Sequence, residues 1–311
     1  MTKLFLGVDG GQSGTTAMIG DEAGRVLGAG EAGPCNHATA AEGRARLERA
    51  VAESLAAACA HAALDPASVA FQAACFGMSG GPEDKREIPA GIIRAARLMV
   101  THDAAIALAG ATASGQGIAV IAGTGSIAYG RNAAGSARAG GWGYLFGDEG
   151  GAFSIAREAL RAAFRMDEGW GPPTAVRDAL LAATGAAGAN EALHRLYTPD
   201  WPRSRVAALA PLVDRAASDG DGVAAEILNR AAQELALLAA AVRGQLWKPG
   251  DAVDVAYIGG VFQSRRLLER FRLLAEMEQG TRCAPPLHGP AEGALLEAWR
   301  AEGLNPTIKF T

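Results

Sequence analysis

Residues 118–150, IAVIAGTGSIAYGRNAAGSARAGGWGYLFGDEG, decide the fold of this 311-residue chain. The apolar run Ile118–Ala122 is typical of a buried strand, and it ends in the small residues Gly123-Thr124-Gly125-Ser126. Such a loop leaves backbone N–H groups accessible, which favours the binding of phosphate. An indole (Trp142) and a carboxylate (Asp148) follow, and these groups suit a polar, ring-shaped ligand. We therefore expect a strand–loop–strand unit with a phosphate site at its first turn.

The same order of elements occurs earlier in the chain. Three strands are expected over residues 3–9, 15–19 and 25–30, and three more over residues 118–122, 127–131 and 136–140. In each set a glycine loop joins the first two strands, and a helical pattern follows the third. This repetition indicates an internal duplication of an α/β lobe. Two such lobes would each offer a glycine loop to a cleft between them.

The remaining patterns complete two domains, the number expected for a chain longer than one core usually supports. Further strands are expected over residues 69–76, 97–101 and 253–258. Helices are expected over residues 39–63, 83–95, 103–108, 263–277 and 290–301, and over most of 152–247, with loops at 169–173 and 198–202. We assign residues 1–113 to an N-terminal lobe, joined by the C-terminal helix in 290–311. Residues 114–289 form the C-terminal lobe, which carries a helical insertion.

The composition limits the possible partners and the compartment. The net charge is −4 and no run of Lys or Arg occurs, so we expect no nucleic-acid partner. No apolar stretch approaches the roughly 20 residues that span a bilayer, and Met1 is followed by a strand rather than by a signal-peptide pattern. We expect a cytoplasmic protein with no membrane partner. The four cysteines are widely separated, without metal-ligand spacing, and are interpreted as reduced thiols.

The first glycine loop follows a hydrophobic strand, so Asp9 lies at the carboxyl end of that strand, where ligands of α/β proteins bind. Gly10 and Gly11 would let backbone amides approach phosphate, and Ser13 and Thr15 would add hydroxyl donors. Asp9 would face the Mg²⁺ that accompanies a nucleotide, through water. A plain β-hairpin explains the same glycines equally well. The loop matches neither the Walker A pattern nor the dinucleotide-binding fingerprint.

Asp103 is the candidate catalytic base. It follows a strand and starts a helix, so its structural interpretation is an N-cap. Transfer of a phosphoryl group to an alcohol needs a carboxylate that orients the hydroxyl and accepts its proton. Gly259 and Gly260 follow the strand over residues 253–258 and would let adenine and ribose lie against the backbone, although a tight strand–helix turn also explains them.

The remaining polar candidates also have a structural alternative. Trp142 covers a sugar face or fills its turn, and Asp148 accepts hydrogen bonds from sugar hydroxyls or lies before a helix as a cap. Asn36 is either a ligand contact or a turn residue. His37 has no recognisable carboxylate partner in the sequence and is not assigned a role.

Together these motifs resemble the N-acetylglucosamine kinase family, a branch of the superfamily of sugar kinases, heat-shock chaperones and actin. Activator-type ATPases of benzoyl-CoA reductase are related to it. The resemblance covers essentially the whole chain and is carried most specifically by Asp103-Ala104-Ala105, Gly123–Ser126, Gly140-Gly141-Trp142-Gly143 and Gly147-Asp148-Glu149-Gly150. It implies an α/β fold of two ribonuclease H-like, actin-like ATPase lobes around a nucleotide cleft.

The resemblance also implies roles for individual residues. Asp103 would be the base, and the sugar would contact Asn36, Gly125, Ser126, Trp142, Gly143 and Asp148. The nucleotide would contact Gly10, Gly11, Ser13, Thr15, Gly123, Thr124, Gly259 and Gly260. ATP and Mg²⁺ are the expected cofactors, and a homodimer is the expected assembly. The chain departs from the family in the first loop, where Gln12 stiffens the turn and Gly14 removes a basic side chain near the phosphates.

The expected function is ATP-dependent phosphorylation of an amino sugar, at the 6-hydroxyl of N-acetyl-D-glucosamine. Glucosamine and N-acetylmuramic acid remain open as the sugar. An ATPase activator of a reductase or dehydratase would need cysteines that hold an iron–sulfur cluster between subunits, and the wide spacing of the cysteines argues against it. A sugar-responsive repressor of the same fold would carry a helix-turn-helix ahead of the first strand, which here is expected to begin by Leu4.

Overall fold

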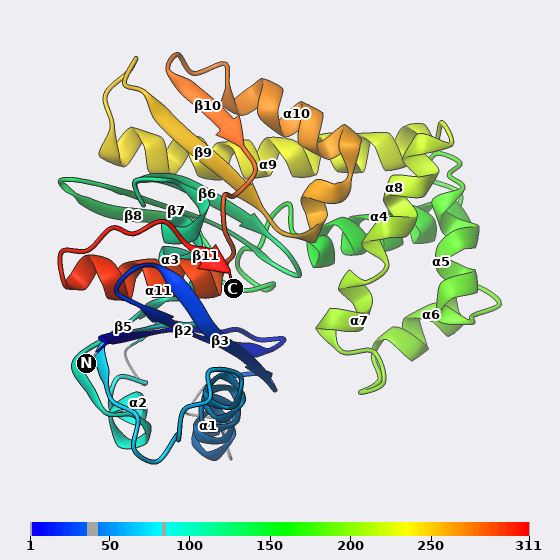
Figure 1. The fold of residues 1–311 in the computed structure, drawn as a ribbon. Helices are drawn as coiled ribbons and strands as arrows, with labels where there is room; N and C mark the ends of the chain where they lie inside the picture. The colour runs from blue at the N-terminus through cyan, green and yellow to red at the C-terminus, as the bar shows by residue number, and fades with distance from the viewer. Residues whose placement is uncertain (1, 36–42, 83–84, 311) are drawn as a thin grey trace. The chain divides into compact units, whose positions relative to one another are not determined.

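The same strand order is built twice in this chain (Figure 1). The structure is a computed structural model that describes residues 2–35, 43–82 and 85–310. It divides into unit 1 (Met1–Gln116 with Pro286–Thr311) and unit 2 (Gly117–Pro285). Each unit contains one sheet.

The sheet of unit 1 has six strands in the order β11-β3-β2-β1-β4-β5. Their bounds are β1 Leu4–Gly10, β2 Thr15–Asp21, β3 Arg25–Ala32, β4 Phe71–Met78, β5 Ala95–His102 and β11 Lys309–Phe310. The first three strands form an antiparallel meander, and β4 and β5 continue the sheet in parallel with β1.

Unit 2 repeats this arrangement in the order β10-β9-β6-β7-β8. Its strands are β6 Gly117–Ala122, β7 Ser126–Asn132, β8 Gly135–Gly140, β9 Val253–Ile258 and β10 Thr281–Ala284. Here too an antiparallel meander is extended by two strands parallel to its first strand. The expected duplication of an α/β lobe is confirmed by this shared topology.

Four helices cover the sheet of unit 1: α1 Gly43–His61, α2 Glu87–Ile92, α3 Asp103–Ala111 and α11 Pro290–Ala301. Successive side chains of a strand point to opposite faces of the sheet, so β1 contributes side chains to two cores. Leu6 and Val8 pack in a cluster with Leu47 of α1, whereas Phe5 packs with Trp299 of α11. By this alternation Asp9 lies on the α11 face of the sheet.

Glycine permits α11 to approach this face closely. A Cβ atom at Gly7 would lie 2.3 Å from the backbone nitrogen of Leu295, and one at Gly293 would lie 1.9 Å from the carbonyl oxygen of Ile106 in α3. The backbones of β1, α3 and α11 are therefore in direct contact, which brings the first turn of α11 close to the end of β1.

Unit 2 carries most of the helices. They are α4 Ala152–Asp167, α5 Val176–Thr184, α6 Ala189–Leu196, α7 Arg203–Ala207, α8 Ala210–Ser218, α9 Gly222–Leu246, the 3₁₀ turn η1 Gly260–Gln263, and α10 Arg265–Ala275. Figure 1 shows α9 running along the sheet beneath α10, while α4–α8 gather beyond the sheet's edge. Leu235 and Val242 of α9 share one core with Ile118 and Val120 of β6. Among the described helices, none is both long and apolar enough to cross a bilayer.

Several expected elements differ in extent. The helix expected over residues 83–95 is the short α2, because Ile92 and Ile93 lead into β5, which begins at Ala95. β10 and β11 were not expected, since strands of four and two residues leave no alternating pattern. The expected start of α1 falls on residues 39–42, outside the described residues.

Candidate functional site

Two candidate residues of unit 1 meet at one edge of its sheet. β1, β4 and β5 are parallel, so their carboxyl ends share an edge, and the register places Asp9 beside Gly77 and Gly77 beside Thr101. Asp103 follows two residues later as the first residue of α3. His102 is the cap residue and no side chain caps the helix, so the N-cap interpretation of Asp103 is wrong.

A third carboxylate, that of Glu292, acts on the same site from the first turn of α11. Burial, together with the charges of Asp103 and Glu292, raises the pKa of Asp9 from its ordinary value to about 7. Burial also raises the pKa of Asp103, although hydrogen bonds from the backbone of Ala104 and the Ser79 hydroxyl oppose this. Sequence reasoning missed Glu292; its place in the first turn of a helix that packs on β1 was the available signal.

The carboxylates of Asp9, Asp103 and Glu292 are suited to hold a cation through its hydration water. Among the described residues, neither Asp9 nor Asp103 forms an ion pair, and no group of His, Cys, Asp and Glu is arranged to hold a metal ion directly. Mg²⁺ keeps much of its hydration shell and is commonly held by one or two carboxylates together with phosphate. Half-buried carboxylates that repel one another therefore fit a hydrated divalent cation.

Asp9→Asn is expected to stabilise the ligand-free protein much more at pH 8 than at pH 5. The folded-state pKa of about 7 lies above the ordinary 3.8. The folded protein therefore keeps a proton that the unfolded chain releases in this window, and stability falls as the pH rises through it. The full shift corresponds to at most about 4 kcal/mol. Urea unfolding at the two pH values measures the effect.

Glu31→Gln, which removes an exposed carboxylate on β3, is the control and should change stability little at either pH. A stabilisation of Asp9→Asn that is equal at pH 5 and pH 8 would contradict the buried-charge account.

The first glycine loop is held by backbone hydrogen bonds, one within the loop and two from neighbouring segments. The amide of Gly11 donates to Gly14 (2.9 Å), and the carbonyl groups of Gly11 and Gly10 accept from the amides of Cys35 (2.9 Å) and Ser79 (3.0 Å). These bonds fix the loop between β1 and β2 against the segments that follow β3 and β4.

The two hydroxyls expected to face phosphate point in different directions. Ser13 is exposed in the loop. Thr15 is buried; its hydroxyl donates to the carbonyl group of Gly33 (2.8 Å) and lies 2.9 Å from the sulfur of Cys35. Its side chain is thus occupied by contacts within unit 1. Asn36 and His37 lie outside the described residues.

The second glycine loop, in unit 2, caps a helix. The carbonyl groups of Gly123 and Thr124 accept hydrogen bonds from the first amides of α4, those of Ala152 (2.9 Å) and Phe153 (3.1 Å). In the part of the chain that the structure describes, the amides of Thr124 and Gly125 donate to no backbone carbonyl group. The loop therefore offers free N–H groups of the kind that bind phosphate.

A cavity of about 570 Å³ joins this loop to the second expected nucleotide segment. It is lined by Gly123, Thr124, Ala152, Ile155, Ser204, Ala207, Ala208, Ala210, Pro211, Asp214, Leu228, Gly260, Val261, Gln263 and Ser264. Gly260 thus lies in the same cavity wall as Gly123 and Thr124, although it is far from them in sequence. Most residues of this wall are small. A volume in this range suits a small organic ligand.

Gly259 holds the two segments of this wall together. Its φ is +109°, and a Cβ atom there would lie 2.4 Å from the carbonyl oxygen of Ala122, just before the glycine loop. At Gly260 no atom lies within 4 Å of the corresponding position. Only the first glycine of the pair is required by the fold.

We expect Gly259→Ala to lower the free energy of unfolding by about 1–3 kcal/mol, because the substitution combines a clash with a strained backbone. Gly260→Ala is the matched control and should stay within about 0.5 kcal/mol of the wild type. Denaturant unfolding of both variants measures the difference. Equal stability of the two variants would show that the close approach of residue 259 to β6 is not needed.

The expected sugar contacts of unit 2 gather around Asp148. This residue is buried, and its carboxylate accepts a hydrogen bond from the amide of Ser126 (3.3 Å) and one from the guanidinium of Arg203. The Ser126 hydroxyl donates to the carbonyl group of Glu149 (2.5 Å). The cap of α4 is Gly151, so Asp148 is not a cap. The structure thus brings Gly125, Ser126 and Asp148 together.

Trp142 does not fill its turn. It is 64% exposed, and the guanidinium of Arg138 lies 4.5 Å from its ring centroid. Gly143 follows with φ +79°, and its carbonyl group accepts from the amides of Phe146 and Gly147. This turn therefore displays the indole on the surface of unit 2.

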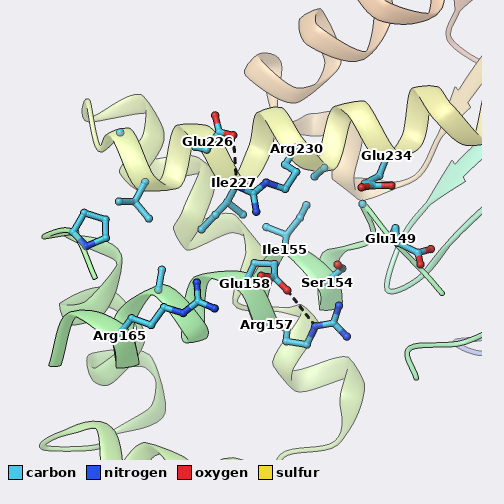
Figure 2. A pocket seen from close by; sticks show the side chains of 16 residues that line it. Glu149, Ser154, Ile155, Arg157, Glu158, Arg165, Glu226, Ile227, Arg230 and Glu234 are labelled. Carbon is cyan, nitrogen blue, oxygen red and sulfur yellow. Dashed lines mark ion pairs between the residues drawn. The ribbon is translucent and has the colours of Figure 1, made fainter. Parts of the chain in front are cut away.

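A second cavity, of about 630 Å³, lies between α4 and α9 and contains none of the expected site residues (Figure 2). Its rim alternates in charge, with ion pairs between Arg157 and Glu158 (3.6 Å) and between Glu226 and Arg230 (3.7 Å). Mixed charge and the absence of a glycine loop make this cavity a poor match to phosphate. The cavity that contains Gly123 and Gly260 is the better match to a nucleotide.

Comparison with known proteins identifies the family. The model of the BadF/BadG/BcrA/BcrD ATPase family matches residues 6–298. The chain belongs to this family. The expected resemblance, and the two-lobed actin-like ATPase fold that it implies, are thereby confirmed.

Two relatives and one solved structure that the chain resembles carry sugar-kinase names. An N-acetylmuramic acid/N-acetylglucosamine kinase of Clostridium acetobutylicum is 34% identical over 280 residues, covering 87% of this chain and 89% of the relative. An N-acetyl-D-glucosamine kinase of Dictyostelium discoideum is 28% identical over 288 residues, covering 86% and 88%. The crystal structure of a proposed N-acetylglucosamine kinase from Chromobacterium violaceum superimposes with a TM-score of 0.77 at 28% identity, covering 94% of this chain and 98% of that one.

Proposed function

We propose that the protein is an ATP-dependent sugar kinase that phosphorylates an amino sugar, N-acetyl-D-glucosamine at its 6-hydroxyl, with Asp103 as general base. The observation that carries this proposal is the pair of half-buried carboxylates, Asp9 and Asp103, at the carboxyl ends of the parallel strands of unit 1. A carboxylate whose pKa is raised toward neutrality is better suited to accept a proton than an ordinary one. The two kinase relatives support the choice of substrate.

In this proposal each unit contributes a glycine loop to ATP. Gly10, Gly11 and Ser13 of unit 1, and Gly123 and Thr124 of unit 2, would lie against the phosphates, with the Ser13 hydroxyl and the Thr124 amide as donors. The adenosine would lie against Gly259 and Gly260. Asp9 would hold the hydrated Mg²⁺, which neutralises charge on the phosphates as the phosphoryl group moves.

The acceptor side uses a different set of side chains. Asp103 would orient the sugar hydroxyl and take its proton, while the Ser79 hydroxyl and the Ala104 amide hold its carboxylate in place. Asp148 would accept hydrogen bonds from ring hydroxyls, with Gly125, Ser126 and Gly143 shaping the backbone around them. Trp142 would cover one face of the sugar, and Asn36 would add a further contact. This division leaves Asp103 alone to move a proton.

N-acetylmuramic acid is the second candidate substrate, because the relative from Clostridium acetobutylicum is named for both sugars. The alternative of an electron-transfer activator gains no support from the cysteines. Each of the four is buried, so none is displayed at the surface for a shared cluster.

A coupled ADP-release assay over a panel of sugars tests the proposal. Turnover is expected with N-acetylglucosamine and with N-acetylmuramic acid, and much less with glucose or with no sugar. Product analysis should place the phosphate on the 6-hydroxyl. ADP release that is independent of every sugar would favour an ATPase and would reject the kinase.

Asp103→Asn should reduce kcat by about 10²–10⁴-fold, because the variant cannot accept the proton of the hydroxyl. The KM for sugar should change only a few-fold, since the amide keeps the size and much of the hydrogen bonding of the carboxylate. Steady-state kinetics with the preferred sugar measures both constants, and sugar binding by calorimetry controls for folding. A kcat near that of the wild type would refute Asp103 as the base.

A further inference from the structure

Asp148 is held in an unfavourable backbone conformation within unit 2. Its φ is +63°, in the left-handed region, where few residues other than glycine are found. Such a conformation persists only when surrounding contacts impose it. The contacts here are made by the side chain of Asp148: one carboxylate oxygen accepts from the Ser126 amide and the other from Arg203.

Arg203 reaches Asp148 from the helical insertion. It is the first residue of α7, directly after Pro202, and lies 55 residues from Asp148 in sequence. Its guanidinium carbon is 5.4 Å from the ring centroid of Tyr144 and 5.9 Å from that of Phe153, and these two rings pack edge to face. The guanidinium is therefore fixed by one carboxylate and two aromatic rings.

The pair is enclosed rather than displayed at the surface. The side chain of Asp148 is 8% exposed and that of Arg203 is 26% exposed. The Nε atom of Arg203 is buried and has no hydrogen-bond partner among the described residues. An unsatisfied buried donor is unfavourable by itself, so the carboxylate contact and the rings must hold Arg203 in this position.

Gly125 of the second glycine loop leaves the space that this pair needs. A Cβ atom at residue 125 would lie 2.4 Å from Asp148 Oδ2 and 2.6 Å from Arg203 Nη2. The loop, the carboxylate and the guanidinium thus form one packed arrangement, and the loop's glycine is matched to the ion pair beside it.

We infer that Arg203 is a positioning residue for sugar recognition, acting through Asp148; the inference rests on the proposed function. A carboxylate has about four acceptor directions. The Ser126 amide and Arg203 occupy one on each oxygen, which leaves one on each oxygen in a fixed orientation. Two adjacent ring hydroxyls fit this arrangement.

Arg203→Met tests this role in the intact protein. With the preferred sugar, we expect the KM for sugar to rise about 10–100-fold, the size of effect typical for positioning partners of a buried binding group. The KM for ATP should stay within about twofold, because Arg203 does not line the nucleotide cavity. A merely structural role would lower stability or alter both KM values together.

Arg205→Ala is the matched control. Arg205 lies on the same helix, stacks on Trp201 at 4.1 Å and donates to the backbone of Asp200, without contact to Asp148. Its removal should leave both KM values unchanged. In an Asp148→Asn background, Arg203→Met should add little further increase in the KM for sugar, since the two residues act as one unit.

Arg203→Lys keeps the charge but loses the planar contact with the rings, so an intermediate rise in the KM for sugar is expected. If Arg203→Met does not fold, this variant decides the question: an increase restricted to sugar supports the inference, and unchanged kinetics overturn it. Wild-type protein that phosphorylates no sugar would refute the proposed function and the inference with it. Active wild type with an unaltered Arg203→Met variant would refute the inference alone.

Discussion

The partial burial of Asp9 beside two other carboxylates is the constraint on which the unit 1 site depends. A lone carboxylate in solution is stabilised by hydration, and here two further carboxylates raise the free energy of its charged form. The ligand-free protein therefore stores an unfavourable interaction at neutral pH. Binding of a cation would relieve it, and the gain would appear as affinity. The close contact of β1, α3 and α11 partly buries this carboxylate, and glycines at the crossing points make that contact possible.

Unit 2 repeats the topology of unit 1, but its glycine loop makes different contacts. Its glycine loop uses carbonyl groups to cap α4 and leaves amides free, whereas the loop of unit 1 is pinned by the segments after β3 and β4. The same strand–loop–strand scaffold thus supplies one loop beside a carboxylate cluster and another beside an ion pair. The duplication preserves the backbone and changes the side chains around it, so each unit carries a different set of polar groups beside its loop.

Strand alternation and glycine loops were sufficient to predict the repeated order of elements along the chain, because both are local properties of the sequence; β10 and β11 are too short to leave such a pattern. They also placed Asp103 and Asp9 at the ends of their strands. The direction of Thr15 could have been predicted as well, since it shares its strand face with Ala17 and Ile19, which are buried. Arg203 could not have been predicted. Nothing near it in sequence distinguishes it from Arg205, and its meeting with Asp148 depends on how α4–α8 fold around the sheet. Glu292 was missed because its partner Asp9 lies near the other end of the sequence.

The C-terminal position of α11 has a consequence for the synthesis of the protein. Trp299 donates to the carbonyl group of Asp21 across a separation of 278 residues, and it packs against Phe5. One face of the first sheet to be synthesised is thus covered by α11, which follows all of unit 2 in the sequence. Until α11 is made, Phe5, Ala73 and Ile106 lack their packing partners on that helix, so unit 1 is completed after unit 2 although five of its six strands are made first. Up to that point the nascent chain exposes an apolar surface on this face of the sheet.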